Sequence, residues 1–251
     1  MPINILPYRS TRRRFSSADR SFLNSNHRLI QLESFNPRDI AGLQLWLDAS
    51  QINGLNDGDP VSTWIDLSGN GNDVTQATAS KKPTYQTSEI NGKPCLRFDG
   101  VDDFLINTLF IAAQPLTILC VSKLTVGKTY SRMFDGGASS RLLIGQQGPN
   151  ELLFYAGSTS PTYIRATPWP WSFYTGIFNG SGSQQFLNGT LLGTADPYNW
   201  GLIELRVGCG WWQGDNEFWA GDIAELIIYN TTLSAGNLTL LHAYIAAKYG
   251  I

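Results

Sequence analysis

The sequence predicts an all-β sandwich that carries one C-terminal helix and follows an arginine-rich N-terminal arm. The 251 residues include 25 Gly and 12 Pro, which separate short apolar runs, and only 15% of the residues are charged. This composition is typical of short strands joined by tight turns, and it excludes a disordered chain or a helical bundle. A single helix after many short strands also argues against alternating βαβ units.

Residues 1–41 form the predicted arm, which lacks the periodic hydrophobicity of a packed element. The arm carries seven Arg, no Lys and three acidic residues, whereas the rest of the chain is acidic. Arg binds carboxylates and phosphates in a planar, bidentate way, which suits the arm to docking. Because the arm contains no Lys, we expect a protein partner rather than nucleic acid. The alternative is a solvated tail without a fixed partner. The proposed docking residues are Arg9, Arg12, Arg13, Arg14 and Arg20.

Strand-like runs begin at Leu43. The alternating segment 43–47 predicts the first strand, and the continuous apolar run 116–124 predicts a buried one. Asn188-Gly189 predicts a hairpin, because both residues tolerate the positive φ angles of a type I′ turn. Gly, Ser, Pro or Asn separate the further predicted strands, which are residues 130–134, 141–144, 152–155, 173–178, 205–207 and 223–229.

The C-terminal segment is the predicted helix. Ser234 is placed to cap its N-terminus, Leu238, Leu241 and Ile245 follow at helical spacing, and Gly250 ends it. The helix therefore follows the strands instead of alternating with them.

Three cysteines lie in apolar, strand-like runs, at Cys95, Cys120 and Cys209. An odd number cannot complete a set of internal disulfides, so we predict buried free thiols. No secretory signal pattern and no run of membrane-spanning length is visible, which predicts synthesis in the cytoplasm and no membrane insertion.

Ordered blocks of sequence carry a family resemblance. They are Leu45-Trp46-Leu47-Asp48-Ala49-Ser50, residues 58–64 and 66–72, Asn91-Gly92-Lys93-Pro94 with residues 96–103, Leu187-Asn188-Gly189-Thr190, and residues 221–229 and 244–251. In this order they resemble the concanavalin A-like, laminin G-like domains of bacterial surface and phage structural proteins. The resemblance covers about residues 43–251 and implies a two-sheet antiparallel jelly roll, with the domain spanning residues 42–251.

Aromatic residues in predicted loops are the candidates for ligand binding. Such side chains stack on sugar rings or anchor protein interfaces, and the alternative is that several of them cap the core. The candidates are Trp169, Trp171, Tyr198, Trp200, Trp211 and Trp212. By contrast, Trp46, Trp64 and Trp219 are expected in the core.

An acidic turn is the candidate metal site. Asp99, Asp102 and Asp103 could offer calcium ligands, although their spacing is not that of an EF-hand loop. The alternative is a solvated turn in which the Asp side chains accept hydrogen bonds from their own backbone. Calcium is the one cofactor that the sequence suggests.

Catalytic signals are weak. The glucanase branch of the superfamily that the chain resembles uses a Glu-x-Asp-x-x-Glu strand motif, because two carboxylates must flank the scissile bond. This motif is missing here, Glu204 and Glu225 stand singly, and Glu217 falls in a predicted loop. We therefore predict no catalytic residues and a chain that is not an enzyme.

Three functions stay open. The first is a virion structural or decoration protein of a bacteriophage, anchored to capsid or tail proteins by its arm, displaying a lectin-like domain on the virion surface as part of a homo-oligomeric assembly. The second is a carbohydrate-binding adhesion or receptor-recognition module that binds polysaccharide, with the bacterial cell surface as its alternative location. The third and least favoured is a glycoside hydrolase.

Overall fold

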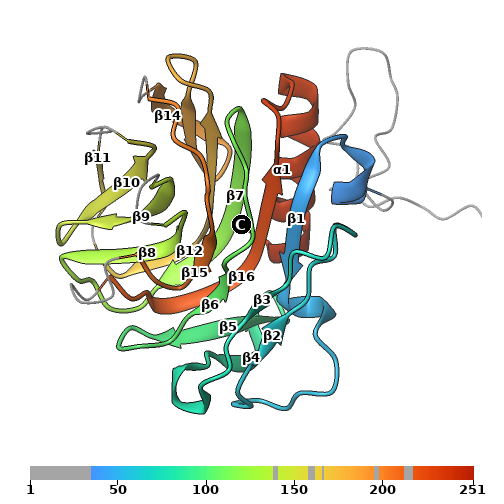
Figure 1. The fold of residues 1–251 in the computed structure, drawn as a ribbon, viewed down its shortest axis with the longest axis vertical. Coiled ribbons are helices and arrows are strands. Elements are labelled where there is room, and N and C mark those ends of the chain that lie inside the picture. Colours follow the sequence, from blue (N-terminus) through green and yellow to red (C-terminus); the bar gives the residue numbers. More distant parts are fainter. Residues whose placement is uncertain (1–34, 138–140, 158–161, 166, 195–197, 212–216) are drawn as a thin grey trace, which may run out of the picture. The chain divides into compact units, whose positions relative to one another are not determined.

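The computed structural model describes residues 35–137, 141–157, 162–165, 167–194, 198–211 and 217–251. These residues form two antiparallel β-sheets and one C-terminal α-helix (Figure 1). Short 3₁₀ helices occupy Pro37–Asp39, Ala49–Gln51 and Ala79–Lys81. The predicted all-β sandwich with one helix is confirmed. No helix within the described ranges is both long and apolar enough to cross a membrane.

Sheet I contains the long buried strands. Its order is β14 (Thr190–Thr194), β13 (Gln184–Leu187), β12 (Trp169–Phe178), β7 (Leu116–Leu124), β16 (Ala220–Tyr229), β5 (Lys93–Asp99) and β4 (Thr84–Ile90), with β1 (Leu43–Asp48) also paired to β16. Strand β16 is therefore central, although it is the last strand in the chain. At the Asn188-Gly189 hairpin, φ is 47° and 76°, which confirms the predicted turn with two positive φ angles.

Sheet II consists of shorter strands. Its order is β11 (Thr162–Ile164), β10 (Glu151–Tyr155), β9 (Leu143–Gln147), β8 (Tyr130–Asp135), β15 (Leu205–Val207), β6 (Leu105–Asn107), β3 (Val74–Thr75) and β2 (Thr63–Trp64). Along β10, Leu152 and Phe154 point into the core, so Leu153 and Tyr155 lie on the opposite, outer face of the sheet. This outer face carries the polar cluster described below.

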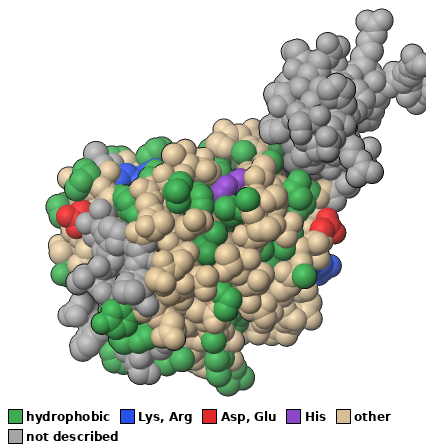
Figure 2. Space-filling model, turned by 90° about the horizontal axis from the view of Figure 1, so that it is seen from above, with side chains coloured by type: hydrophobic (Ala, Val, Ile, Leu, Met, Phe, Trp, Pro, Cys, Tyr) green, Lys and Arg blue, Asp and Glu red, His purple; other side chains and the backbone are tan. Residues whose placement is uncertain are grey.

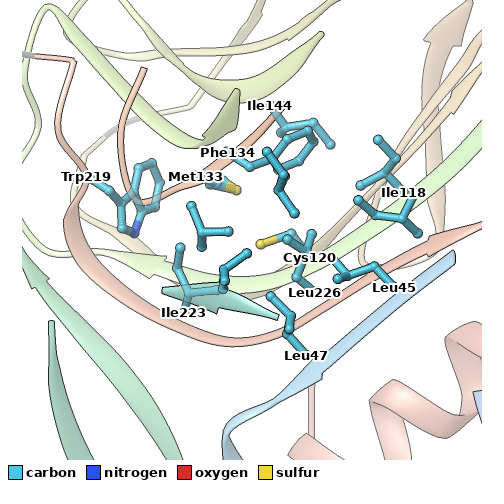
Figure 3. Packing of buried hydrophobic residues seen from close by; sticks show 14 of the residues in the cluster. Leu45, Leu47, Ile118, Cys120, Met133, Phe134, Ile144, Trp219, Ile223 and Leu226 are labelled. Atoms are coloured by element: carbon cyan, nitrogen blue, oxygen red, sulfur yellow. The ribbon is translucent and has the colours of Figure 1, made fainter. Parts of the chain in front are cut away.

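The core lies between the two sheets (Figure 3). Leu45 and Leu47 of β1, Ile118 of β7 and Leu226 of β16 meet Phe134 and Ile144 of sheet II in this layer, and all are fully buried. The three cysteines are buried free thiols, as predicted, and burial raises the pKa of each. Trp46, Trp64 and Trp219 are buried as expected.

Helix α1 (Ala235–Tyr249) is confirmed with both of its predicted ends. The Ser234 Oγ accepts a hydrogen bond from the backbone N of Asn237, and Gly250 closes the helix with φ of 71°. The helix is tied to sheet I through Glu225 of β16, whose buried carboxylate accepts hydrogen bonds from four groups. The donors are Trp46 Nε1 at 2.7 Å, Tyr244 Oη at 3.0 Å, Lys248 Nζ at 2.9 Å and Tyr249 Oη at 2.8 Å.

One predicted loop is wrong. Trp169 and Trp171 are predicted to lie in a loop, yet β12 begins at Trp169 and includes both residues. Pairing with β7 is interrupted between Trp169 and Ser172, so Pro170 does not have to donate a ladder hydrogen bond. The Trp169 side chain is fully buried in the core, where its ring lies 6.0 Å from that of Trp219.

Candidate functional site

A buried ionic cluster lies on the outer face of sheet II. A bulge in β8 creates it: Met133 and Phe134 both point into the core, so Arg132 and Asp135 both point outward. Opposite Arg132, β9 carries Gly145, where an added Cβ would lie 2.3 Å from the Ser131 carbonyl oxygen. Glycine at this position therefore lets the two strands approach each other beneath the arginine.

Two guanidiniums and two carboxylates make up this cluster, which we call the ionic floor. One nitrogen of Arg141, Nη2, lies 2.5 Å from Asp135 Oδ2 and 2.7 Å from Glu217 Oε2. Arg132 Nη2 lies 3.0 Å from Oε1, the other oxygen of Glu217. Arg132 Nη1 donates to the backbone carbonyl of Gln146. The charges of the ionic floor therefore balance.

Burial shifts the pKa of two groups in the ionic floor. It raises the pKa of Asp135, an effect that the Arg141 guanidinium opposes, and it lowers the pKa of Arg132. Each charge has a partner of opposite sign, which offsets the cost of removing it from water. Within the described residues, the Nε of Arg132 and the Oδ1 of Asp135 are buried without a hydrogen-bond partner.

Above the ionic floor is a pocket of about 320 Å³, which we call the floor pocket. Tyr130 of β8 and Tyr155 of β10 line it with aromatic rings, and Arg132 lies 5.5 Å from the centre of the Tyr130 ring. The ring of Trp200 meets Tyr155 edge-on, with the ring centroids 6.4 Å apart. The remaining lining residues are Arg141, Leu143, Gln147, Leu153 and Glu217. The floor pocket thus combines a fixed polar base with aromatic walls.

Two of the predicted aromatic candidates lie beside the floor pocket. Trp200 packs on Tyr155, and the backbone N of Trp211 donates to Asp135 Oδ2 at 3.0 Å. The expectation for Trp169 is wrong, because a fully buried core side chain cannot contact a ligand. Trp212 lies outside the described residues.

Two further aromatic candidates lie elsewhere. Trp171 is half-buried beside Lys123 of β7, whose Nζ lies 5.2 Å from the centre of its ring. Tyr198 is 50% exposed and lines a second pocket. The docking arginines Arg9, Arg12, Arg13, Arg14 and Arg20 fall outside the described residues, so arm docking stays a prediction.

The acidic turn makes backbone hydrogen bonds, as the alternative predicts, but Asp103 is buried and not solvated. Oxygens of Asp99, Asp102 and Asp103 lie within 4.8 Å of one another. Asp99 Oδ1 accepts from the backbone N of Val101 at 2.7 Å, and Asp103 Oδ2 accepts from that of Asp99 at 3.0 Å. Burial, helped by the neighbouring carboxylates, raises the pKa of Asp103 to about 7. Calcium binding here stays a prediction.

Sequence reasoning missed the residues that build the floor pocket. Arg132 gave one local signal, since a charged residue inside an otherwise apolar strand must find a partner. Nothing local connects it to Glu217, which lies in a loop far along the chain. The sequence also gave no sign of a carboxylate pair, but Asp135 and Glu217 bind the same nitrogen of Arg141 and are therefore close together.

Solved structures similar to this chain come from carbohydrate-active enzymes. Domain 4 of AbnA, a GH43 extracellular arabinanase from Geobacillus stearothermophilus in complex with arabinotriose, is 15% identical, with a TM-score of 0.59, over 80% of this chain and 98% of that domain. A Trypanosoma rangeli sialidase in complex with sialic acid is 12% identical, with a TM-score of 0.57, over 83% of this chain. A GH54 α-L-arabinofuranosidase is 15% identical, with a TM-score of 0.56, over 76% of this chain.

These likenesses cover different shares of the similar proteins. The chain spans 33% of the sialidase and 51% of the arabinofuranosidase. At such identities the likeness extends to the fold alone, so the activities of these proteins are not carried over to this chain. No curated protein matches the sequence.

The prediction that the chain is not an enzyme is corrected by these comparisons. The similar structures belong to an arabinanase, a sialidase and an arabinofuranosidase, and the fold is compatible with a glycoside hydrolase. The missing Glu-x-Asp-x-x-Glu motif excludes only one arrangement, because a fold can bring carboxylates together from distant segments.

The family is shown by the sequence itself. A family model described as the concanavalin A-like lectin/glucanases superfamily matches residues 98–239, more than half of the chain. This stretch runs from the end of β5 into α1 and includes every residue of the ionic floor. The chain belongs to the concanavalin A-like lectin/glucanases superfamily.

Proposed function

We propose that the domain binds an oligosaccharide in the floor pocket on the outer face of sheet II. The observation that carries the proposal is the pairing of Tyr130 and Tyr155 with the ionic floor in one concave site. The C–H faces of a sugar pack on aromatic rings, and its hydroxyls exchange hydrogen bonds with guanidinium, carboxylate and amide groups. The ionic floor holds these groups in fixed positions, which lowers the entropy cost of binding.

The class of ligand is supported by the similar structures. The arabinanase domain that matches over most of this chain was solved with arabinotriose bound, and the sialidase with sialic acid. Because the charges of the ionic floor balance, a neutral sugar fits this pocket better than a charged one. Arabino-oligosaccharides are therefore the first ligands to test.

Titration calorimetry with arabinotriose tests the proposal. Tyr155→Ala removes one aromatic wall, and we expect about a tenfold loss of affinity. Leu191→Ala is the matched control, because Leu191 is a half-exposed apolar residue on β14 of sheet I. Absence of binding by the unmodified protein, or equal affinity for the Tyr155→Ala variant, would refute the proposal.

Hydrolysis of the bound glycan is a second candidate function, favoured by the pair Asp135 and Glu217. Retaining glycosidases hold two carboxyl groups about 5 Å apart. In this pair, burial raises the pKa of Asp135 in the direction that suits a general acid, and Glu217 lines the floor pocket. Because Asp135 has no exposed surface, a sugar reaches it only after its neighbours move, so binding is our first proposal.

Chromatography of arabino-oligosaccharides after incubation tests hydrolysis. Shorter products from the unmodified protein, lost in Glu217→Gln, support it. If the protein binds the ligand but yields no shorter products, hydrolysis of that ligand is excluded. The place of this domain in a phage particle, its oligomeric assembly and its partners stay predictions from the sequence.

A further inference from the structure

We infer that the glycan path continues past Trp200 into a second pocket, so that the domain holds an extended, uncharged oligosaccharide instead of one terminal sugar. This inference rests on the proposed function and deepens it. The second pocket, which we call the amide pocket, has a volume of about 720 Å³. Its lining includes Gln114, Asn179, Ser181, Tyr198 and Asn199.

The lining of the amide pocket identifies the class of ligand. The described residues that line it offer amides, a hydroxyl and the half-exposed ring of Tyr198, and none of them is charged. A charged group entering the amide pocket would lose water without gaining a counter-ion, whereas hydroxyls would find donors and acceptors. Figure 2 shows one face of the molecule, on which few Lys, Arg, Asp or Glu side chains are seen among the coloured residues.

Gln114 makes the amide pocket a preformed structure. Its Oε1 accepts from the backbone N of Gly180 at 2.8 Å, and its Nε2 donates to the carbonyls of Tyr198 and Trp200 at 3.2 and 2.8 Å. One side chain therefore joins three separate chain segments. Backbone hydrogen bonds of 2.8 Å in both directions between Ala112 and Leu202 fix the same two loops. A ligand would bind without ordering the pocket first.

Trp200 contacts a lining residue of each pocket. Its carbonyl is bound by Gln114 in the amide pocket, and its ring contacts Tyr155 in the floor pocket. The ring also lies over Gly157, where an added Cβ would be 2.6 Å from Trp200 Cδ2, so the backbone there approaches the indole closely. Tyr155 and Trp200 are therefore in ring contact, and Tyr198, two residues before Trp200, lines the amide pocket.

The test uses calorimetry of the full chain with arabino-oligosaccharides of increasing length, from the disaccharide upward. We expect affinity to rise with length once the floor pocket is filled. Tyr198→Ala should remove this gain, about tenfold for the longest ligand, and leave the disaccharide unaffected. Ser181→Arg, which places a bulky charge in the amide pocket, is the second variant and should act in the same way. Thermal unfolding confirms that both variants are folded.

The outcomes separate the two proposals. Binding of the disaccharide that is weakened by Tyr155→Ala supports the floor pocket. If affinity then does not rise with ligand length, and Tyr198→Ala and Ser181→Arg bind as tightly as the unmodified protein, the extended path is refuted. Stronger binding of an acidic oligosaccharide of equal length also refutes the extended, uncharged ligand. If no member of the series binds, the proposed function fails, and the extension fails with it.

Discussion

Arg141 binds both carboxylates of the ionic floor, and its replacement by Met should lower the free energy of unfolding. The change leaves Asp135 fully buried beside Glu217 with no cation of its own. Removing one member of a buried ion pair costs about 3 to 5 kcal/mol of unfolding free energy. Because the Arg141 side chain is 17% exposed, we expect the lower end, about 3 kcal/mol.

The loss of stability in the Arg141→Met variant should depend on pH. Burial already raises the pKa of Asp135, and loss of the guanidinium raises it further. A carboxyl whose pKa is higher in the folded state favours folding when it is protonated, so this contribution is present at acidic pH and lost as the pH rises through the folded-state pKa. The Arg141→Met variant should therefore lose more stability near neutral pH than in mild acid.

Urea denaturation of the unmodified protein and of the Arg141→Met variant, near neutral pH and in mild acid, measures the loss of stability. The double variant Asp135→Asn/Arg141→Met should recover part of the loss, since it removes the stranded charge together with its partner. A loss below about 1 kcal/mol, the range of exposed ion pairs, would refute the reasoning. A loss independent of pH, with no recovery in the double variant, would show that Arg141 stabilises the fold by packing alone.

Two further predictions concern stability away from the pockets. Ser234→Ala removes the N-cap of α1 and should lower the unfolding free energy by about 1 kcal/mol in urea denaturation, whereas Ser234→Asp should retain most of it. Burial lowers the pKa of His242 from 6.5 to about 4, so stability should fall as the pH drops across this interval. His242→Gln should flatten that part of the pH profile, and an unchanged slope would contradict the assignment.

Local signals explain what could be predicted. The run Leu116–Leu124 became β7 with those bounds, and the Asn188-Gly189 turn and both ends of α1 were placed correctly. In each case adjacent residues determine the structure: a continuous apolar run, a pair tolerant of positive φ, a capping hydroxyl and a terminal glycine. The loop predicted around Trp169 was wrong because it was based on the neighbouring Pro residues alone. Pro170 is accepted in β12 because pairing with the distant strand β7 is irregular there.

The candidate site is built by contacts between residues far apart in the chain, so the sequence alone did not predict it. Arg132 and Asp135 point the same way only because β8 is bulged, and Glu217 reaches them from a distant loop. Trp200 and Trp211, which were candidates for ligand binding, lie next to the floor pocket without lining it, so a role in binding stays a prediction. The sequence shows that these residues are aromatic, but it does not show that they lie beside Tyr155 and Asp135.

The central position of β16 has a consequence for synthesis on the ribosome. Strand β16 lies between β7 and β5 and also pairs with β1, yet it is translated after all of them. Until residue 229 has emerged, the nascent chain exposes the edges of strands that await their partner. Fragments that stop before Ala220 should therefore require chaperones or aggregate, and the native sheet should close in one late step.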